Sequence, residues 1–112
     1  MVYLIWNTAG HFKYYEKTTL TLIMIETILK RAESFRTPIN FCGEDAGKPL
    51  EAVCLLAMGI RTLSMRPASI GAVKALIRDI NIIELRKVID QALVSGEQSI
   101  RPKVESWIKA QI

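Results

Sequence analysis

The chain has 112 residues, enough for one domain at most. Half of the residues are hydrophobic and 23% are charged, a composition that excludes a disordered chain and predicts a packed core. The formal net charge is +4, but the lysines and arginines are scattered among acidic residues and form no basic run with aromatic residues. This pattern favours a solvated surface over a nucleic-acid interface.

Neither a membrane span nor a disulfide framework is predicted. The apolar stretch of residues 20–25 is much shorter than the roughly 20 residues that a spanning helix needs, and Glu26 follows it directly. The N-terminus does not show the pattern of a secretory signal. The two cysteines, Cys42 and Cys54, fit no zinc signature with the single histidine, His11. We therefore expect a cytoplasmic protein with reduced thiols.

The first expected elements are a helix and a strand. Residues 1–17 show no clear period and stay unassigned, whereas residues 18–112 form the domain. A helix is expected from Thr18 to about Arg36, before Pro38, because apolar residues recur at three- and four-residue steps. Residues 38–42 are partly β-prone and run into a glycine, which predicts a buried strand. The expected apolar face of the helix comprises Leu22, Ile25, Ile28, Leu29, Ala32 and Phe35.

A second helix and strand follow, and then three more helices. Pro49 suits the first turn of a helix that Gly59 ends, and residues 60–65 form the second strand. The next helix opens after Pro67 with Ser69 as a plausible N-cap. Asn81 and Glu84 make a capping box for the fourth helix, and Ser99 is expected to cap the last.

This order predicts an α/β fold. A helix between two strands favours parallel pairing with a right-handed crossover, and we expect the strands at Ile39–Cys42 and Thr62–Met65. Parallel sheets are normally wide and covered on both faces, so two parallel strands would leave both edges unpaired. The sequence therefore resembles a slice of a larger α/β sheet or barrel.

One motif carries candidate chemistry. Residues 40–47 place the thiol of Cys42 at the carboxyl end of a strand, next to two carboxylates and two glycines. In a barrel, that end of a strand is where active sites lie. From the spacing alone, a small buried hydrophobic role for Cys42 stays the favoured alternative. Cys54 lies on the apolar face of a helix, where a role in the core is expected.

The residues around Cys42 resemble the cysteine loop of the phosphoenolpyruvate-utilising enzymes, which include enzyme I of the bacterial phosphotransferase system and pyruvate phosphate dikinase. The resemblance covers roughly residues 23–112 and is closest to the nitrogen-related type of enzyme I. It rests on Cys42-Gly43-Glu44, Ala46-Gly47, the run from Gly59 to Met65, the run from Pro67 to Lys74, Ile77-Arg78 and Gln91-Ala92-Leu93.

The resemblance implies a C-terminal fragment of a (β/α)₈ barrel, with two short parallel strands and a mostly helical remainder. The family transfers a phosphoryl group from phosphoenolpyruvate to a protein histidine with Mg²⁺, which leaves a pyruvate enolate. Cys42 matches the cysteine that protonates the enolate. A phosphocarrier protein is the implied partner, and the last elements imply a homodimer or self-association.

The departures from the family pattern are equally informative. The strands that carry the Mg²⁺ and phosphate ligands of the family are missing, as is the histidine-bearing domain, and residues 1–17 do not match the family pattern. Asp45 stands where the family commonly has an apolar residue, and Arg66 stands where it commonly has a small one. We therefore expect the isolated chain to be inactive, with no substrate-binding or metal residues assigned and no cofactor of its own. The alternative is a non-catalytic remnant that serves as an interaction or dimerisation module.

Overall fold

Helix α2 (Thr19–Ser34) begins the described part of this computed structural model, residues 19–96 and 100–112. The expectations for residues 1–17 and for a Ser99 cap lie outside the described residues. The α2 face predicted from the sequence is largely confirmed, since Leu22 and Ile25 are buried in the core. Phe35 was wrongly placed on that face. It follows the last helical residue and is 73% exposed, because Arg36 has a positive φ of 52° and turns the chain away.

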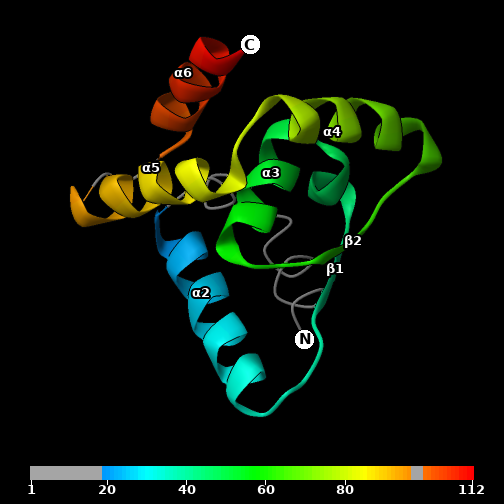
Figure 1. Cartoon of the computed structure of the whole chain (residues 1–112). Coiled ribbons are helices and arrows are strands. Elements are labelled where there is room, and N and C mark those ends of the chain that lie inside the picture. The colour runs from blue at the N-terminus through cyan, green and yellow to red at the C-terminus, as the bar shows by residue number, and fades with distance from the viewer. Residues whose placement is uncertain (1–18, 97–99) are drawn as a thin grey trace.

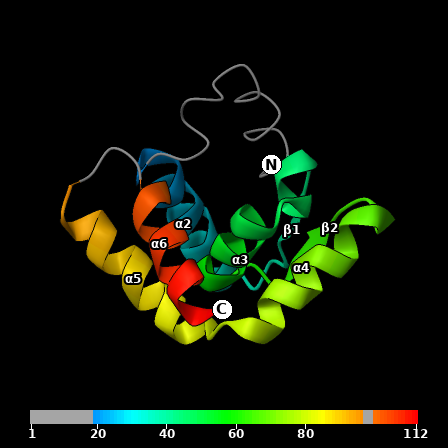
Figure 2. The ribbon, with the colours of Figure 1, turned by 90° about the horizontal axis from the view of Figure 1, so that it is seen from above.

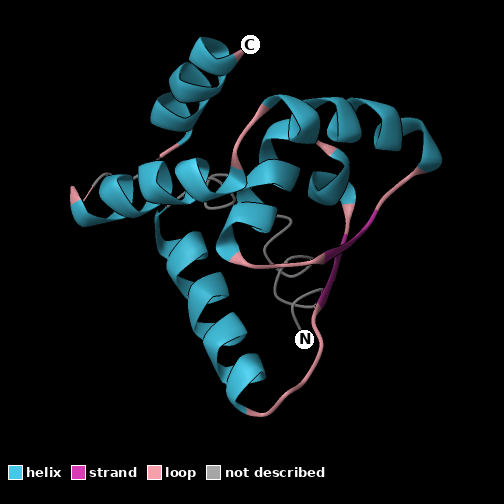
Figure 3. Ribbon diagram, in the orientation of Figure 1, coloured by secondary structure: helices cyan, strands magenta, loops and turns pink. Residues whose placement is uncertain are grey.

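Two strands, β1 (Asn40–Cys42) and β2 (Thr62–Ser64), confirm the predicted parallel pair. Asn40 pairs with Thr62, Phe41 with Leu63, and Cys42 with Ser64. Each strand is one residue shorter than expected. The short 3₁₀ helix η2 (Glu44–Gly47) and helix α3 (Pro49–Met58) connect the two strands. Figure 3 shows the two strands as the only magenta segments in a mostly helical chain.

Helix α3 lies at the centre of the described part of the chain, as Figures 1 and 2 show. Its sequence starts with Pro49 in the first turn and ends at Gly59, whose φ of 116° suits glycine alone. Five of its ten residues are buried, and it contacts α2, α4 and α5. Because nearly all residues of α3 are apolar, other elements must cover it on several sides, and this explains its central position.

Three helices complete the chain: α4 (Pro67–Asp79), α5 (Ile82–Val94) and α6 (Arg101–Gln111). The predicted cap at Ser69 is wrong, because α4 already begins at Pro67 and Arg66 takes the N-cap position. Asn81 does cap α5. Its side-chain oxygen accepts hydrogen bonds from the backbone N–H groups of Ile83 and Glu84, at 2.9 and 3.3 Å.

The core forms where α2, α3, α5 and α6 meet the buried side of the strands. Figure 2 shows α2, α5 and α6 on one side of α3, with the strands and α4 on the other. Among the described residues, no helix is both long and apolar enough to cross a membrane. The largest fully buried side chains are Phe41, Val53, Ile60, Leu85, Ile89 and Val104.

Candidate functional site

The two strands have one buried face and one polar face. Phe41 is completely buried and its register partner Leu63 packs against the core. Because side chains alternate along a strand, the residues on either side of this pair point the opposite way. That polar face carries Asn40, Cys42, Thr62 and Ser64, of which Cys42 is half-buried and the other three are exposed.

Cys42 is therefore placed as the sequence predicted, at the carboxyl end of β1. Its register partner is Ser64, the last residue of β2, so a thiol and a hydroxyl lie side by side at the same edge of the sheet. Asn40 shares this polar face and reaches Ser64 across the strands. Its Nδ2 lies 3.2 Å from Ser64 Oγ, and Ser64 Oγ lies 3.3 Å from Asn40 Oδ1.

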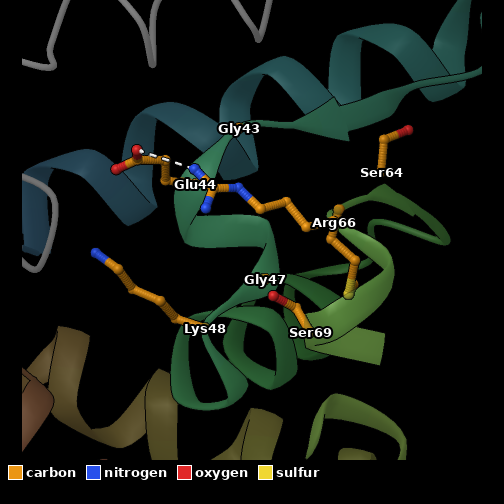
Figure 4. Close-up of a pocket in the computed structure, with 8 residues that line it drawn as sticks. Gly43, Glu44, Gly47, Lys48, Ser64, Arg66 and Ser69 are labelled. Atoms are coloured by element: carbon orange, nitrogen blue, oxygen red, sulfur yellow. Dashed lines mark ion pairs between the residues drawn. The ribbon is translucent and has the colours of Figure 1, made fainter. Parts of the chain in front are cut away.

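A pocket of about 650 Å³ opens beyond these strand ends, as Figure 4 shows. Its lining comes from the loop that follows Cys42, the last residue of β2 and the first turn of α4. Cys42 precedes the loop and does not itself line the pocket. The lining residues are Gly43, Glu44, Gly47, Lys48, Ser64, Met65, Arg66 and Ser69.

Two glycines shape the loop after Cys42. Gly43 has a φ of 133°, a conformation that residues with a Cβ rarely adopt, so the chain can leave the strand at a sharp angle. Gly47 is needed for space instead. A Cβ at this position would lie 2.9 Å from Ser69 Oγ and 3.1 Å from Ser69 Cβ. The loop therefore lies directly against the first turn of α4.

The pocket carries charges of both signs. Arg66 forms a loose ion pair with Glu44, 3.9 Å across the mouth of the pocket, and both side chains are more than four-fifths exposed. Lys48 contributes a second cation from the start of α3. Exposed pairs of this kind contribute little stability, so Arg66 can change partner at small energetic cost. The lining thus holds two cations and two hydroxyls, which suit an anion, beside the carboxylate of Glu44.

Cys54 is separated from this site; it is half-buried on α3 and lines a small cavity together with residues of α6. It packs against the hydrophobic core, and Glu51 and Arg101 lie beside it. Burial and the nearby Glu51 carboxylate raise the pKa of the Cys54 thiol to about 12, against the smaller opposing effect of Arg101. At neutral pH this cysteine is an un-ionised core residue, as the sequence predicted.

Metal ligands do not gather at the described site. Within residues 19–96 and 100–112, no group of three His, Cys, Asp or Glu side chains is arranged to hold a metal ion. Mg²⁺ in proteins is commonly held by only one or two carboxylates together with substrate oxygens, and Glu44 is the carboxylate that lines this pocket.

Sequence reasoning singled out Cys42 but missed the residues that surround it. Ser64 was expected only within the second strand and Ser69 only as a helix cap, and Lys48 was assigned no role. The signal that could have found them is topological, because carboxyl ends of neighbouring parallel strands and the helices after them meet at one edge of a sheet.

The profile of one protein family, described as "PEP-utilising enzyme, PEP-binding domain", matches residues 7–82. The match includes Cys42 and every residue that lines the pocket. It begins at residue 7, so the match extends into the segment 1–17 that showed no resemblance to the family, while residues 1–6 stay outside it. No solved structure matches the chain.

Curated relatives agree with this match. A phosphoenolpyruvate-protein phosphotransferase of Cupriavidus necator is 35% identical over 72 residues, which are 64% of this chain and 12% of the relative. A multiphosphoryl transfer protein of Xanthomonas campestris is 36% identical over 72 residues, 64% of this chain and 9% of the relative. A phosphoenolpyruvate-protein phosphotransferase of Borreliella burgdorferi is 30% identical over 77 residues, 69% of this chain and 13% of the relative. The aligned stretch thus spans about a tenth of each relative's length. With its family profile matched over more than half of its length, the chain belongs to the PEP-utilising enzymes and carries part of their PEP-binding domain.

Proposed function

We propose that this chain is the cysteine-bearing part of a phosphoenolpyruvate-protein phosphotransferase, with Cys42 as the proton donor to a pyruvate enolate. One observation supports the proposal above others. The thiol ends a strand on the polar face of a parallel pair, and the loop after it forms a pocket lined by cations, hydroxyls and glycines. A proton donor needs this combination of access and nearby anion-binding groups.

In the proposed site, each part of the pocket has a task. Lys48 and Arg66 attract the carboxylate of the enolate, and Gly43 and Gly47 let the backbone approach it closely. Cys42 then delivers its proton to the methylene carbon. Phosphoryl transfer to a protein histidine, the phosphocarrier partner and the cytoplasmic location belong to the complete enzyme in this proposal. The Mg²⁺ that the family uses also belongs to the complete enzyme in this proposal.

We also propose that the fold is a fragment of a (β/α)₈ barrel. Phe41 and Leu63 face the helices, while Asn40 and Ser64 face the opposite side, as strand residues of a closed barrel do. We also propose the nitrogen-related type of enzyme I, because the runs from Gly47 to Ala52 and from Pro67 to Gly71 resemble that type.

The experiment that tests the catalytic role is exchange of the methyl protons of pyruvate with deuterium by a complete enzyme that contains this chain, as wild type, Cys42→Ala and Cys42→Ser. If Cys42 is the proton donor, any exchange by the wild type falls about 10²-fold or more in both variants. Cys54→Ala is the matched control, because its un-ionised thiol lies in the α3–α6 interface, and its exchange should equal that of the wild type. Normal exchange in folded Cys42→Ala would refute the assignment.

A second candidate is a non-catalytic interaction or dimerisation module. One observation favours it: apolar side chains remain exposed on several helices, including Ile23 at 44%, Met24 at 43% and Ile83 at 70%. Exposed apolar surface marks interfaces. In this case the chain binds no phosphoenolpyruvate in calorimetric titration with Mg²⁺ and sediments as a dimer or larger species. A strict monomer that binds phosphoenolpyruvate would exclude this candidate.

A further inference from the structure

Ser64 is the residue directly across the strands from Cys42, at the last register pair of the sheet. Paired residues of a sheet project to the same face, and neighbouring strands lie about 4.8 Å apart. The Ser64 hydroxyl and the Cys42 thiol are therefore neighbours on the polar face. Ser64 also lines the pocket, so its hydroxyl lies next to the space where a substrate would lie (Figure 4).

Asn40 holds the Ser64 hydroxyl through a hydrogen bond that can run in either direction. The two distances, 3.2 Å from Nδ2 to Oγ and 3.3 Å from Oγ to Oδ1, allow both arrangements. A hydroxyl has one proton to donate and two lone pairs that accept. When the Asn40 amide donates to Ser64 Oγ, the hydroxyl proton is left for another acceptor.

A thiolate at Cys42 would be that acceptor. Hydrogen bonds to an ionised partner are about twice as strong as those between neutral groups, so ionisation of the thiol would draw the Ser64 proton away from Asn40 Oδ1. The amide can then reverse its role and donate to Ser64 Oγ. Nothing has to move beyond the rotation of one hydroxyl.

We propose that Ser64, oriented by Asn40, is a positioning residue that stabilises the thiolate of Cys42. The proposal rests on the proton-donor role proposed above. In that step the S–H bond of Cys42 breaks, and the proton forms a C–H bond at the methylene carbon of the enolate. The electron pair of the enolate becomes the new C–H bond, while the sulfur keeps its own pair as a thiolate. Ser64 donates a hydrogen bond to this thiolate and neither gains nor loses a proton.

The test follows the alkylation of Cys42 by iodoacetamide as a function of pH, with peptide mass spectrometry to separate Cys42 from Cys54. Since the thiolate is the reacting form, loss of a hydrogen bond to it slows alkylation at neutral pH only. We expect Ser64→Ala to react about tenfold more slowly at pH 7. The limiting rate at alkaline pH should not change. Ser64→Thr, which keeps the hydroxyl, should restore most of the rate.

Thr62→Val is the matched control, because Thr62 is another exposed hydroxyl residue on the same face, paired with Asn40. Its alkylation profile should match that of the wild type. Asn40→Ala should slow the reaction at pH 7 about threefold, since the hydroxyl remains but loses its orientation. If Ser64→Ala does not fold, the alkylation rate of Asn40→Ala tests the proposal in its place.

Three results would overturn the proposal: an unchanged pH profile in Ser64→Ala, an unchanged profile in Asn40→Ala, or an equal change in Thr62→Val. The alkylation experiment uses no substrate, so it separates this inference from the proposed function. If Cys42→Ala leaves proton exchange of pyruvate intact while Ser64→Ala slows alkylation, the catalytic role fails and the coupling of Ser64 to the thiol stands. If Cys42→Ala abolishes exchange while Ser64→Ala alters neither reaction, only the role of Ser64 fails.

Discussion

Gly47 lies so close to Ser69 that a Cβ on the glycine would sit 2.9 Å from the serine hydroxyl oxygen. The contact joins the loop that follows Cys42 to the first turn of α4. The two residues are far apart in sequence, so this contact helps to fix the loop against α4 by close packing. The geometry of the pocket depends on the absence of one side chain.

Gly47→Ala should therefore destabilise the chain by about 1–2 kcal/mol, the usual cost of overpacking a tight contact. Gly71→Ala is the matched control, because a Cβ at Gly71 meets nothing within 4 Å and the residue lies inside α4. That substitution should stabilise by about 0.5–1 kcal/mol through helix propensity. Urea unfolding measures both. Equal effects of the two substitutions would contradict the close approach.

The sequence predicted the elements and the position of Cys42 because both depend on local patterns. Periodic apolar residues identified the helices, and Pro38 with Gly43 bounded the first strand. The sequence placed the end of α2 too late. Phe35 continues the three- and four-residue spacing of apolar residues although the helix ends at Ser34, and the positive φ of Arg36 then turns the chain. Ser64 could not be recognised as a neighbour of the thiol, since register between strands 20 residues apart is a tertiary property.

The caps show the same limit at α4 and α5. Asn81 and Ser69 carry equally suitable side chains in the sequence, yet only Asn81 caps a helix. Pro67 fixes its own φ in the helical range and starts α4 two residues before Ser69, which is then drawn into the first turn. Ser69 is left to pack against Gly47. Which residue caps a helix depends on where the helix begins, and Pro67 sets the start of α4.

Asn81→Ala should destabilise the chain by about 1 kcal/mol, because the N–H groups of Ile83 and Glu84 lose their acceptor. Asn81→Asp keeps the acceptor and adds a charge that favours a helix N-terminus, so it should be neutral or slightly stabilising. Thermal unfolding followed by circular dichroism tests both. An Asn81→Asp variant as unstable as Asn81→Ala would show that the cap contributes nothing.

Cys54 should make the stability of the chain fall at alkaline pH. Its pKa is raised by burial and by Glu51, from 9.0 to about 12, so the folded state keeps the thiol protonated. The stabilising effect is complete below pH 9 and is lost as pH rises from about 9 to 12, where the unfolded thiol ionises first. At pH 10, one unit above the pKa of the unfolded thiol, this effect should lower the free energy of unfolding by about 1 kcal/mol.

Urea unfolding at pH 8 and pH 10 measures this loss. Cys54→Ala should have a smaller difference between the two pH values than the wild type, although it is less stable at both because a buried sulfur is removed. An unchanged difference in Cys54→Ala would contradict the raised pKa.

Arg86 joins three helices and gives the last prediction. From α5, its guanidinium group donates to Glu26 in α2 at 2.9 Å, to Asp90 at 2.9 Å, and to the backbone carbonyl of Met58 at the end of α3 at 3.3 Å. The side chains of Arg86 and Glu26 are 29% and 25% exposed, so this pair is only partly screened by water. Lysine, with one ammonium group, cannot reproduce the planar fork that reaches all three partners.

Arg86→Ala should cost about 2 kcal/mol, because a half-buried carboxylate and a helix-end carbonyl both lose a charged donor. Arg86→Lys should recover less than half of that cost. Lys87→Ala is the matched control on the next residue. Its ion pair with Glu84 at 3.1 Å joins side chains that are 64% and 52% exposed, and the loss should stay below about 0.5 kcal/mol. Since Arg86 lies away from the pocket, alkylation of Cys42 in folded Arg86→Ala should keep the wild-type rate. Equal destabilisation by Arg86→Ala and Lys87→Ala would show that the three helices are held by apolar packing alone.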